Sequence, residues 1–248
     1  MDNTANNDWI VPDWPAPANV RACSTYRFGG ISKPPFGTLN LADHVGDDST
    51  NVRVNRQKLV DRLQLPETPR WLSQYHSDVV VNAEDSSGLA EADASFTSSR
   101  NVVCAVLTAD CLPVLVCNKS GTRVAAIHAG WRGLYAGIIE NTIQALAIAP
   151  EETLVWLGPA IGPTAYEVGR EVYHHFVDNN VNASRAFEAS RPGHWFANLY
   201  ELARIELRAT GIQNVWGGNH CTYTESQCFF SYRREGVTGR MATIIWFD

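Results

Sequence analysis

Residues 102–133, VVCAVLTADCLPVLVCNKSGTRVAAIHAGWRG, decide the fold of this chain. The stretch holds three short apolar runs, at 102–107, 113–117 and 124–127, and they are parted by the turn residues of 108–110 and 120–121. Short runs rich in β-branched residues and bounded by turns are typical of strands buried on both faces. We therefore predict a buried β-sheet at this point of the sequence.

The pattern on either side of this stretch alternates between strands and helices. A strand is expected at 21–28, where it ends at Gly29-Gly30. The other expected strands are 71–72, 79–81, 154–157, 215–216 and 241–247. The expected helices are 51–65 with Ser49 or Thr50 as its cap, 134–148, 171–178 and 198–210. This order predicts an α/β fold with mixed β-sheets, and the absence of a repeat or a low-complexity tract predicts a single domain over residues 1–248.

The composition is that of a globular protein with an acidic surface. Of the 248 residues, 45% are apolar and 19% are charged, which is enough apolar material for a packed core. The formal net charge of −6 argues against a nucleic-acid or anionic-membrane surface, so we expect neither as a partner. Only three of the twenty basic residues are lysines, and arginine is the better bidentate ligand for phosphate or carboxylate.

The six cysteines are interpreted as thiols, metal ligands or nucleophiles. Residues 1–8 are acidic and polar, unlike a secretory signal, and the longest apolar stretch, 102–117, is broken by Thr108, Asp110 and Pro113. The sequence therefore predicts a cytoplasmic protein, and a reducing compartment disfavours three disulfides. It defines no oligomeric state.

Three potential soft-metal ligands lie where predicted strands meet turns, namely His76, Cys111 and His128. Their separations of 35 and 17 residues match no local zinc-finger spacing. Two histidines and one cysteine leave one tetrahedral position open, as a catalytic zinc site requires, and zinc there would lower the pKa of a bound water toward ~7. From the residues alone, the alternative is that each is an ordinary buried side chain at a strand end.

Several motifs resemble those of the bacterial YfiH family, also called the laccase-domain or polyphenol-oxidase family and, in enterobacteria, peptidoglycan editing factor. The resemblance runs in order from about Trp9 to the C-terminus. The motifs that carry it are at 27–32, 39–41, 46–47, 55–56, 74–76, 91–94, 108–115, 128–133, 158–169 and 229–241.

The resemblance implies a four-layer α/β/β/α sandwich, similar also to the catalytic domain of cytotoxic necrotizing factor. It implies a zinc ion held by two histidines and one cysteine, which fall here on His76, Cys111 and His128. The first histidine motif of the family usually reads Gln-Val-His-Gly, whereas this chain has Tyr75 and Ser77 around the histidine. The departure leaves the ligand in place and concerns only the wall of the pocket.

The family resemblance further implies purine nucleoside chemistry: phosphorolysis of adenosine, inosine and methylthioadenosine to base and ribose 1-phosphate, and deamination of adenosine. Deamination needs a proton shuttle beside the zinc, for which Asp93 and Asp110 are the candidates. Their alternatives are a cap for Asp93 and a turn-forming role for Asp110. Phosphorolysis needs cationic side chains for phosphate, and the candidate substrate-binding residues in the motifs are Arg27, Arg132, Arg233 and Arg234.

The same residues admit other readings. The four arginines could instead form structural ion pairs with Asp47, Asp48 or Glu167. Copper could occupy the three metal donors, but a multicopper oxidase needs many more histidines, often in His-x-His pairs, and this chain has seven and no such pair.

Two further alternatives assign different roles to the three potential metal ligands. In a cysteine hydrolase, Cys111 is the nucleophile and His128 its base. Such an enzyme would suit correction of peptidoglycan precursors that carry serine in place of alanine on UDP-MurNAc, the role that the resemblance to the enterobacterial members implies. In a non-enzymatic zinc-stabilised module, Cys104, Cys117 or His220 would have to supply a fourth ligand.

Overall fold

The strands predicted around residue 110 form the centre of two sheets. A computed structural model describes residues 9–85 and 88–248 of the chain, so the polar start at 1–8 and the turn predicted at 86–87 lie outside the described residues. The larger sheet has the order β14 (Val215–Gly217), β10 (Thr153–Leu157), β8 (Leu112–Asn118), β9 (Val124–Ala129), β6 (Ala94–Thr97) and β4 (Val80–Asn82). The second has the order β1 (Trp9–Ile10), β2 (Val20–Thr25), β15 (Met241–Phe247) and β7 (Cys104–Thr108).

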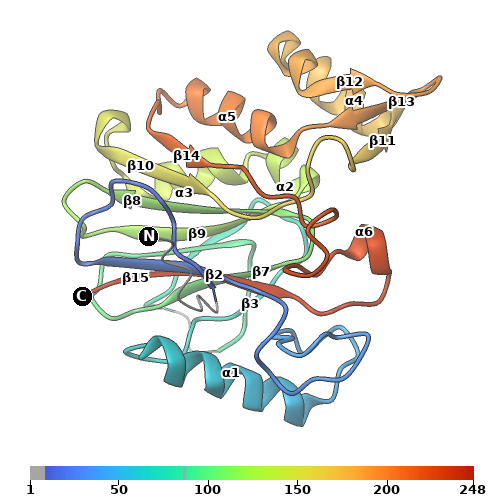
Figure 1. The fold of residues 1–248 in the computed structure, drawn as a ribbon. Coiled ribbons are helices and arrows are strands. Elements are labelled where there is room, and N and C mark those ends of the chain that lie inside the picture. The colour runs from blue at the N-terminus through green and yellow to red at the C-terminus, as the bar shows by residue number, and fades with distance from the viewer. Residues whose placement is uncertain (1–8, 86–87) are drawn as a thin grey trace, which may run out of the picture.

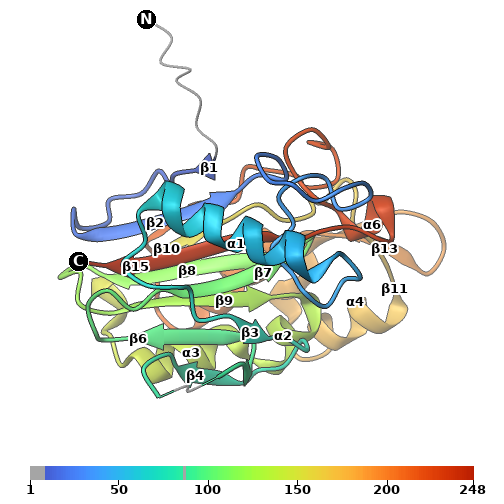
Figure 2. The same ribbon diagram turned by 90° about the horizontal axis from the view of Figure 1, so that it is seen from below.

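The helices cover the outer faces of these sheets (Figure 1). Helices α3 (Ile138–Leu146) and α5 (Leu199–Ala209) lie over the six-stranded sheet, and α1 (Ser49–Leu63) lies under the four-stranded one, as the second view also shows (Figure 2). The remaining helices are the short α2 (Trp131–Ala136) and α6 (Tyr232–Glu235), α4 (Arg170–Val177), and the 3-10 turns η1 (Pro150–Glu152) and η2 (Val181–Ala186).

The two main sheets pack face to face, which explains the continuous apolar runs. Along β8, Val114 and Val116 belong to the core beneath α3 and α5, whereas Leu115 and Cys117 belong to the core between the sheets. Side chains alternate across a strand, so a strand buried on both faces has no polar positions. The prediction of a mixed α/β fold is confirmed.

The structure corrects several local predictions. The single helix predicted at 134–148 is wrong: Gly137, with φ of +95°, separates α2 from α3, and α2 already begins at Trp131. The cap of α1 is Asp48, whose carboxylate accepts the Thr50 N–H at 2.7 Å, and not Ser49 or Thr50. The first predicted strand ends at Thr25 and not at residue 28.

Two small sheets had little signal in the sequence, and of their strands only Leu72–Ser73 overlaps a predicted one, that at 71–72. One has the order β11 (Glu167–Gly169), β13 (His194–Ala197) and β12 (Phe187–Ala189), and the other pairs β3 (Leu72–Ser73) with β5 (Ala90–Glu91). These strands are two to four residues long and mostly half-buried, so they show neither alternation nor an apolar run. Among the described residues no helix has the length and apolarity needed to cross a membrane.

Candidate metal centre

Strand pairing brings His76, Cys111 and His128 together at one end of the six-stranded sheet. We call these three residues the metal centre. Their ligand atoms all lie within 4.8 Å of one another, and the distance from His76 Nε2 to Cys111 Sγ is 3.7 Å. Tetrahedral zinc with ordinary Zn–N and Zn–S bonds separates a nitrogen from a sulfur ligand by about 3.6 Å. The spacing of these donors therefore fits zinc.

The register of the sheet explains why residues distant in sequence meet here. In the antiparallel pair of β8 and β9, Leu112 faces Ala129, which places Cys111 opposite Gly130, two residues after His128. A methyl group on Gly130 would lie 2.9 Å from Cys111 Sγ and 3.1 Å from the Cδ2 atom of His76. Only glycine leaves room for both ligands at this point.

Asp93 connects the two histidines. It precedes β6, whose pairing with β9 sets it opposite His128, and one carboxylate oxygen lies 2.7 Å from His128 Nδ1. The same carboxylate accepts the backbone N–H groups of Tyr75, His76 and Ser77 at 3.3, 3.1 and 2.6 Å. His76 has a φ of +66°, which non-glycine residues rarely adopt, and these bonds hold it there.

Because the Nδ1–H of His128 donates to the Asp93 carboxylate, Nε2 is the ring atom available to a metal. Carboxylate–histidine pairs of this kind orient the ligand ring and raise its basicity in many zinc proteins. Burial raises the pKa of the Asp93 carboxyl, but hydrogen bonds from His128 and Ser77 outweigh burial and hold the pKa well below its usual range. Asp93 is thus a fully buried carboxylate with all its partners inside the protein.

The pKa shifts of Cys111 and His128 favour a thiolate beside an imidazolium. Burial raises the pKa of the Cys111 thiol, but the neighbouring rings of His128 and His76 outweigh burial and lower the pKa to about 6. Burial lowers the pKa of His128, whereas Cys111 and Asp93 raise it to about 9. The thiolate is the form that binds metal and the form that attacks carbonyls. The imidazolium of His128 suits the second chemistry as it stands, whereas metal binding requires that it first release its Nε2 proton.

A cavity of about 500 Å³ opens above the metal centre, within the range of small-molecule sites. Its wall carries an indole, a phenol and two guanidinium groups, from Trp131, Tyr232, Arg132 and Arg240. No aspartate or glutamate is among the described residues that line it. The complete lining is His44, Gln74, His76, Leu107, Thr108, Ala109, Cys111, His128, Trp131, Arg132, Tyr232 and Arg240.

Asp110, predicted as a proton shuttle, does not line this cavity. Asp110 lies in the turn between β7 and β8 and has a φ of +96°. Its carboxylate accepts the Thr222 hydroxyl at 2.6 Å and the backbone N–H of Arg233 at 2.7 Å. The carboxylate therefore ties the C-terminal segment to the turn that carries Cys111.

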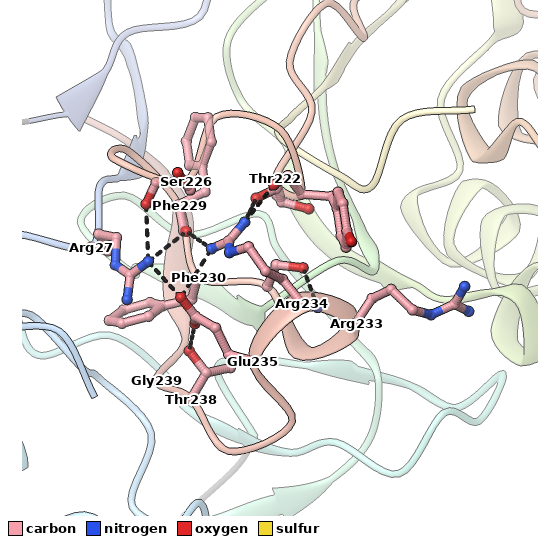
Figure 3. Close-up of polar contacts among 12 residues, drawn as sticks. Arg27, Thr222, Ser226, Phe229, Phe230, Arg233, Arg234, Glu235, Thr238 and Gly239 are labelled. Atoms are coloured by element: carbon pink, nitrogen blue, oxygen red, sulfur yellow. Dashed lines mark hydrogen bonds and ion pairs between the residues drawn. The ribbon is translucent and has the colours of Figure 1, made fainter. Parts of the chain in front are cut away.

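Of the four predicted substrate-binding arginines, only Arg132 lines the cavity. Arg233 does not line it: its guanidinium lies over the Tyr166 ring at 5.1 Å and donates to the Glu167 carbonyl at 3.0 Å. Arg27 and Arg234 lie elsewhere, bonded to the carboxylate of Glu235 at 2.7 and 3.1 Å (Figure 3).

We call Arg27, Arg234, Glu235 and Thr238 the arginine cluster. Thr238 donates its hydroxyl proton to Glu235, and both guanidinium groups donate to the Phe229 carbonyl. Figure 3 shows the Arg233 guanidinium pointing away from this cluster. The remaining acceptors are the carbonyls of Ser226 for Arg27 and of Thr222 and Tyr223 for Arg234. These contacts match the structural alternative for Arg27 and Arg234, although with Glu235 as the acidic partner.

Sequence reasoning assigned no role to several residues of the cavity wall. Arg240 and Gln74 lie in motifs that carried the family resemblance, which was the available signal. Trp131 and Tyr232 lie in such motifs as well. His44 lies outside them and had no signal, because its place at the cavity depends on how distant loops pack.

The fold and the metal centre together define a class, an α/β protein with a His-Cys-His group beneath an open cavity. The chain belongs to the family described as multi-copper polyphenol oxidoreductase laccase, which matches residues 21–248. The resemblance to the YfiH proteins within it is confirmed. A Pseudomonas aeruginosa protein named purine nucleoside phosphorylase is 52% identical over 243 residues, which are 98% of this chain and 99% of that protein.

Two further proteins are similar to this chain over nearly its whole length. Escherichia coli K12 purine nucleoside phosphorylase YfiH is 50% identical over 238 residues, covering 96% of this chain and 98% of that protein. The crystal structure of a Neisseria meningitidis protein of the DUF152 family superposes with a TM-score of 0.95 at 49% identity, over 98% of this chain and 100% of that one.

Proposed function

We propose that this chain is a zinc-dependent purine nucleoside phosphorylase that also deaminates adenosine. The observation that carries the proposal is the open three-donor metal centre at the base of a cavity lined by arginine and aromatic side chains. The names of the relatives support the phosphorylase activity alone. The substrates proposed are adenosine, inosine and methylthioadenosine, together with phosphate.

The residues have distinct roles in this proposal. His76, Cys111 and His128 hold the metal, and Gly130 leaves space for it. Zinc bound there supplies a Lewis acid beside the substrate. Trp131 and Tyr232 offer flat surfaces to the purine, and Arg132 offers a guanidinium to the phosphate. In the reaction a phosphate oxygen bonds to C1′ of the ribose while the bond from C1′ to the purine nitrogen breaks, and the purine leaves with a proton.

Asp93 and Asp110 are assigned positioning roles in place of the shuttle role that the sequence suggested. The Asp93 carboxylate accepts bonds from His128 and from the backbone of residues 75–77, and Asp110 accepts from Thr222 and Arg233. A carboxylate whose pKa is depressed by such donors, as that of Asp93 is, releases and takes up a proton poorly near neutral pH. Deamination, which exchanges the amino group of adenosine for the oxygen of water, would draw its proton from solvent in the open cavity.

The direct test is product analysis by chromatography of adenosine and inosine incubated with zinc-loaded protein, with and without phosphate. We expect ribose 1-phosphate and free base only when phosphate is present, and inosine from adenosine in both cases. Cys111→Ala should abolish all products, whereas Cys228→Ser, a half-buried cysteine outside the metal centre, should retain them. Absence of every product from the zinc-loaded wild-type protein would refute the proposal.

The charged pair of Cys111 and His128 favours a second candidate, a metal-free cysteine hydrolase. A thiolate with a pKa of about 6 beside an imidazolium is the arrangement of an activated nucleophile and its base. Its substrate would be an amide, such as a peptidoglycan precursor with serine linked to UDP-MurNAc. Chelation should activate or spare this enzyme, whereas it should abolish the zinc enzyme.

Copper chemistry has less support despite the description of the family. The described residues contain one cluster of three histidine, cysteine or acidic ligands, and a multicopper centre requires several. Copper would have to use the same three donors as zinc. The zinc-stabilised module is also weakened, because Cys104, Cys117 and His220 do not belong to that cluster.

A further inference from the structure

Arg240 is a guanidinium in the cavity wall whose charge no carboxylate neutralises. It lies immediately before β15, and its backbone N–H donates to the side chain of Asn40 at 3.0 Å. No ion pair joins Arg240 to an acidic residue in the described part of the chain. The pKa of Arg240 is lowered by burial, which the nearby Cys111, Asp110 and Tyr232 oppose.

One edge of this guanidinium is held by the protein and the other is available. Nη1 donates to the carbonyls of Thr238 at 2.9 Å and Gly239 at 3.0 Å, and the group lies 5.9 Å from the centre of the Tyr232 ring. Within residues 9–85 and 88–248, Nε and Nη2 donate to no protein acceptor. An arginine with a fixed position and a free edge is suited to bidentate binding of an oxyanion.

Arg132 supplies a second charge to the same cavity. Its guanidinium lies over the ring of its neighbour Trp131 at 4.5 Å and forms no ion pair or hydrogen bond with the described residues. Arg27 and Arg234, in contrast, already share the carboxylate of Glu235. Two unneutralised arginines above a metal centre, in a chain of net charge −6, mark a place built for an anion.

We propose that Arg240, assisted by Arg132, forms the subsite for inorganic phosphate, and that Arg27 and Arg234 lie outside it. The inference rests on the proposed phosphorolysis and names the residues that bring the second substrate to the ribose. Arg240 touches the phosphate through Nε and Nη2 and needs no rearrangement of its own backbone, because its Nη1 bonds remain in place. The phosphate group of a nucleotide has the same chemistry and is the competing occupant.

The test measures phosphate binding and turnover separately in zinc-loaded protein. Calorimetry gives the Kd of phosphate, and steady-state kinetics give the KM values of phosphate and inosine. For Arg240→Met we expect the Kd and KM of phosphate to rise at least about tenfold, with the KM of inosine within about twofold of wild type. Arg240→Lys should recover part of the loss and guards against misfolding of the first variant.

Arg123→Met is the matched control. Arg123 also donates to two backbone carbonyls, those of Leu146 at 2.6 Å and Ala147 at 2.7 Å, but it does not line the cavity. We expect its phosphate Kd and KM to equal those of wild type. An equal loss in Arg123→Met and Arg240→Met would show a general loss of structure and overturn the proposal.

Further outcomes separate this inference from the proposed function. An unchanged phosphate Kd in Arg240→Met overturns the subsite even if phosphorolysis is observed. Phosphate binding that depends on Arg240 without any ribose 1-phosphate supports the subsite and refutes the phosphorylase. A nucleoside 5′-monophosphate that binds more tightly than phosphate and loses affinity in Arg240→Met assigns the subsite to a nucleotide and overturns the choice of inorganic phosphate.

Discussion

The metal centre and the arginine cluster differ in whether their polar groups are already satisfied inside the protein. In the arginine cluster, Arg27 and Arg234 share the carboxylate of Glu235 and donate to backbone carbonyls. In the metal centre, the ligand atoms of three side chains meet below an open cavity. Asp110 connects the two through Thr222: Asp110 precedes Cys111 and accepts the Thr222 hydroxyl, and the Thr222 carbonyl accepts from Arg234.

Structural and functional polar residues in this fold differ in whether their hydrogen bonds are all made inside the protein. Groups whose hydrogen bonds are all made inside the protein stabilise it, and removal of one partner leaves the others unsatisfied. Groups that are held in place but still have free donors or lone pairs can bind a ligand. Mutations in the metal centre should therefore lower the affinity for metal. Mutations in the arginine cluster should lower the free energy of unfolding.

The largest effect is expected from Gly130→Ala. The backbone there has φ of −69° and ψ of 167°, which alanine adopts freely, so the cost comes from the contacts of the new methyl group with Cys111 and His76. We expect zinc affinity, measured by competition with a coloured chelator, to fall by at least about 100-fold. Gly169→Ala, where a methyl group meets no atom within 4 Å, is the control and should bind zinc as wild type does.

Asp93→Asn should weaken the metal centre without touching its ligands. The amide loses the negative charge that orients His128 and that holds the backbone of residues 75–77. We expect a loss of about 10–100-fold in zinc affinity. Asp47→Asn is the matched control, because Asp47 accepts bonds from Ser32 and Asn40 away from the metal centre. Equal zinc affinities in the two variants would contradict a positioning role for Asp93.

Glu235→Gln should lower stability and leave zinc affinity unchanged. The variant leaves the guanidinium groups of Arg27 and Arg234 without their carboxylate, in a half-buried position. We expect the free energy of unfolding in urea to fall by about 1–3 kcal/mol, with unchanged zinc affinity. A loss of zinc affinity with unchanged stability would place Glu235 in the functional site and end the contrast between the clusters.

The smallest effect is expected in how the stability difference between wild type and Glu235→Gln depends on pH. Burial raises the pKa of Glu235, but hydrogen bonds from Thr238, Arg27 and Arg234 outweigh burial and lower it. A lowered folded pKa contributes stability above the unfolded value of about 4.3, and this contribution is lost as the pH falls through the folded pKa. The gap between wild type and Glu235→Gln should therefore narrow between roughly pH 5 and pH 3, by less than about 1 kcal/mol because solvent screens the pair. A gap that widens toward acid would contradict this sign.

Much of the fold could be predicted because burial on both faces leaves a strong pattern. The runs at 102–107, 113–117, 124–127 and 241–247 correspond to β7, β8, β9 and β15. The helix at 134–148 was predicted without its break, since a glycine at residue 137 is compatible with a helix until tertiary packing requires φ of +95°. The strands of β11, β12 and β13 are too short to show a period.

The chemical types of the site can be read from the order of residues: two histidines and a cysteine at predicted strand ends, and an excess of arginine over lysine. Which polar side chains are free depends on tertiary packing. Asp93 and Asp110 point into hydrogen-bonded networks, Arg27 and Arg234 are joined to Glu235, and Arg240 lines the cavity. The reason is physical: residue type sets what a side chain can bind, whereas availability depends on partners that pairing and packing bring from distant parts of the chain.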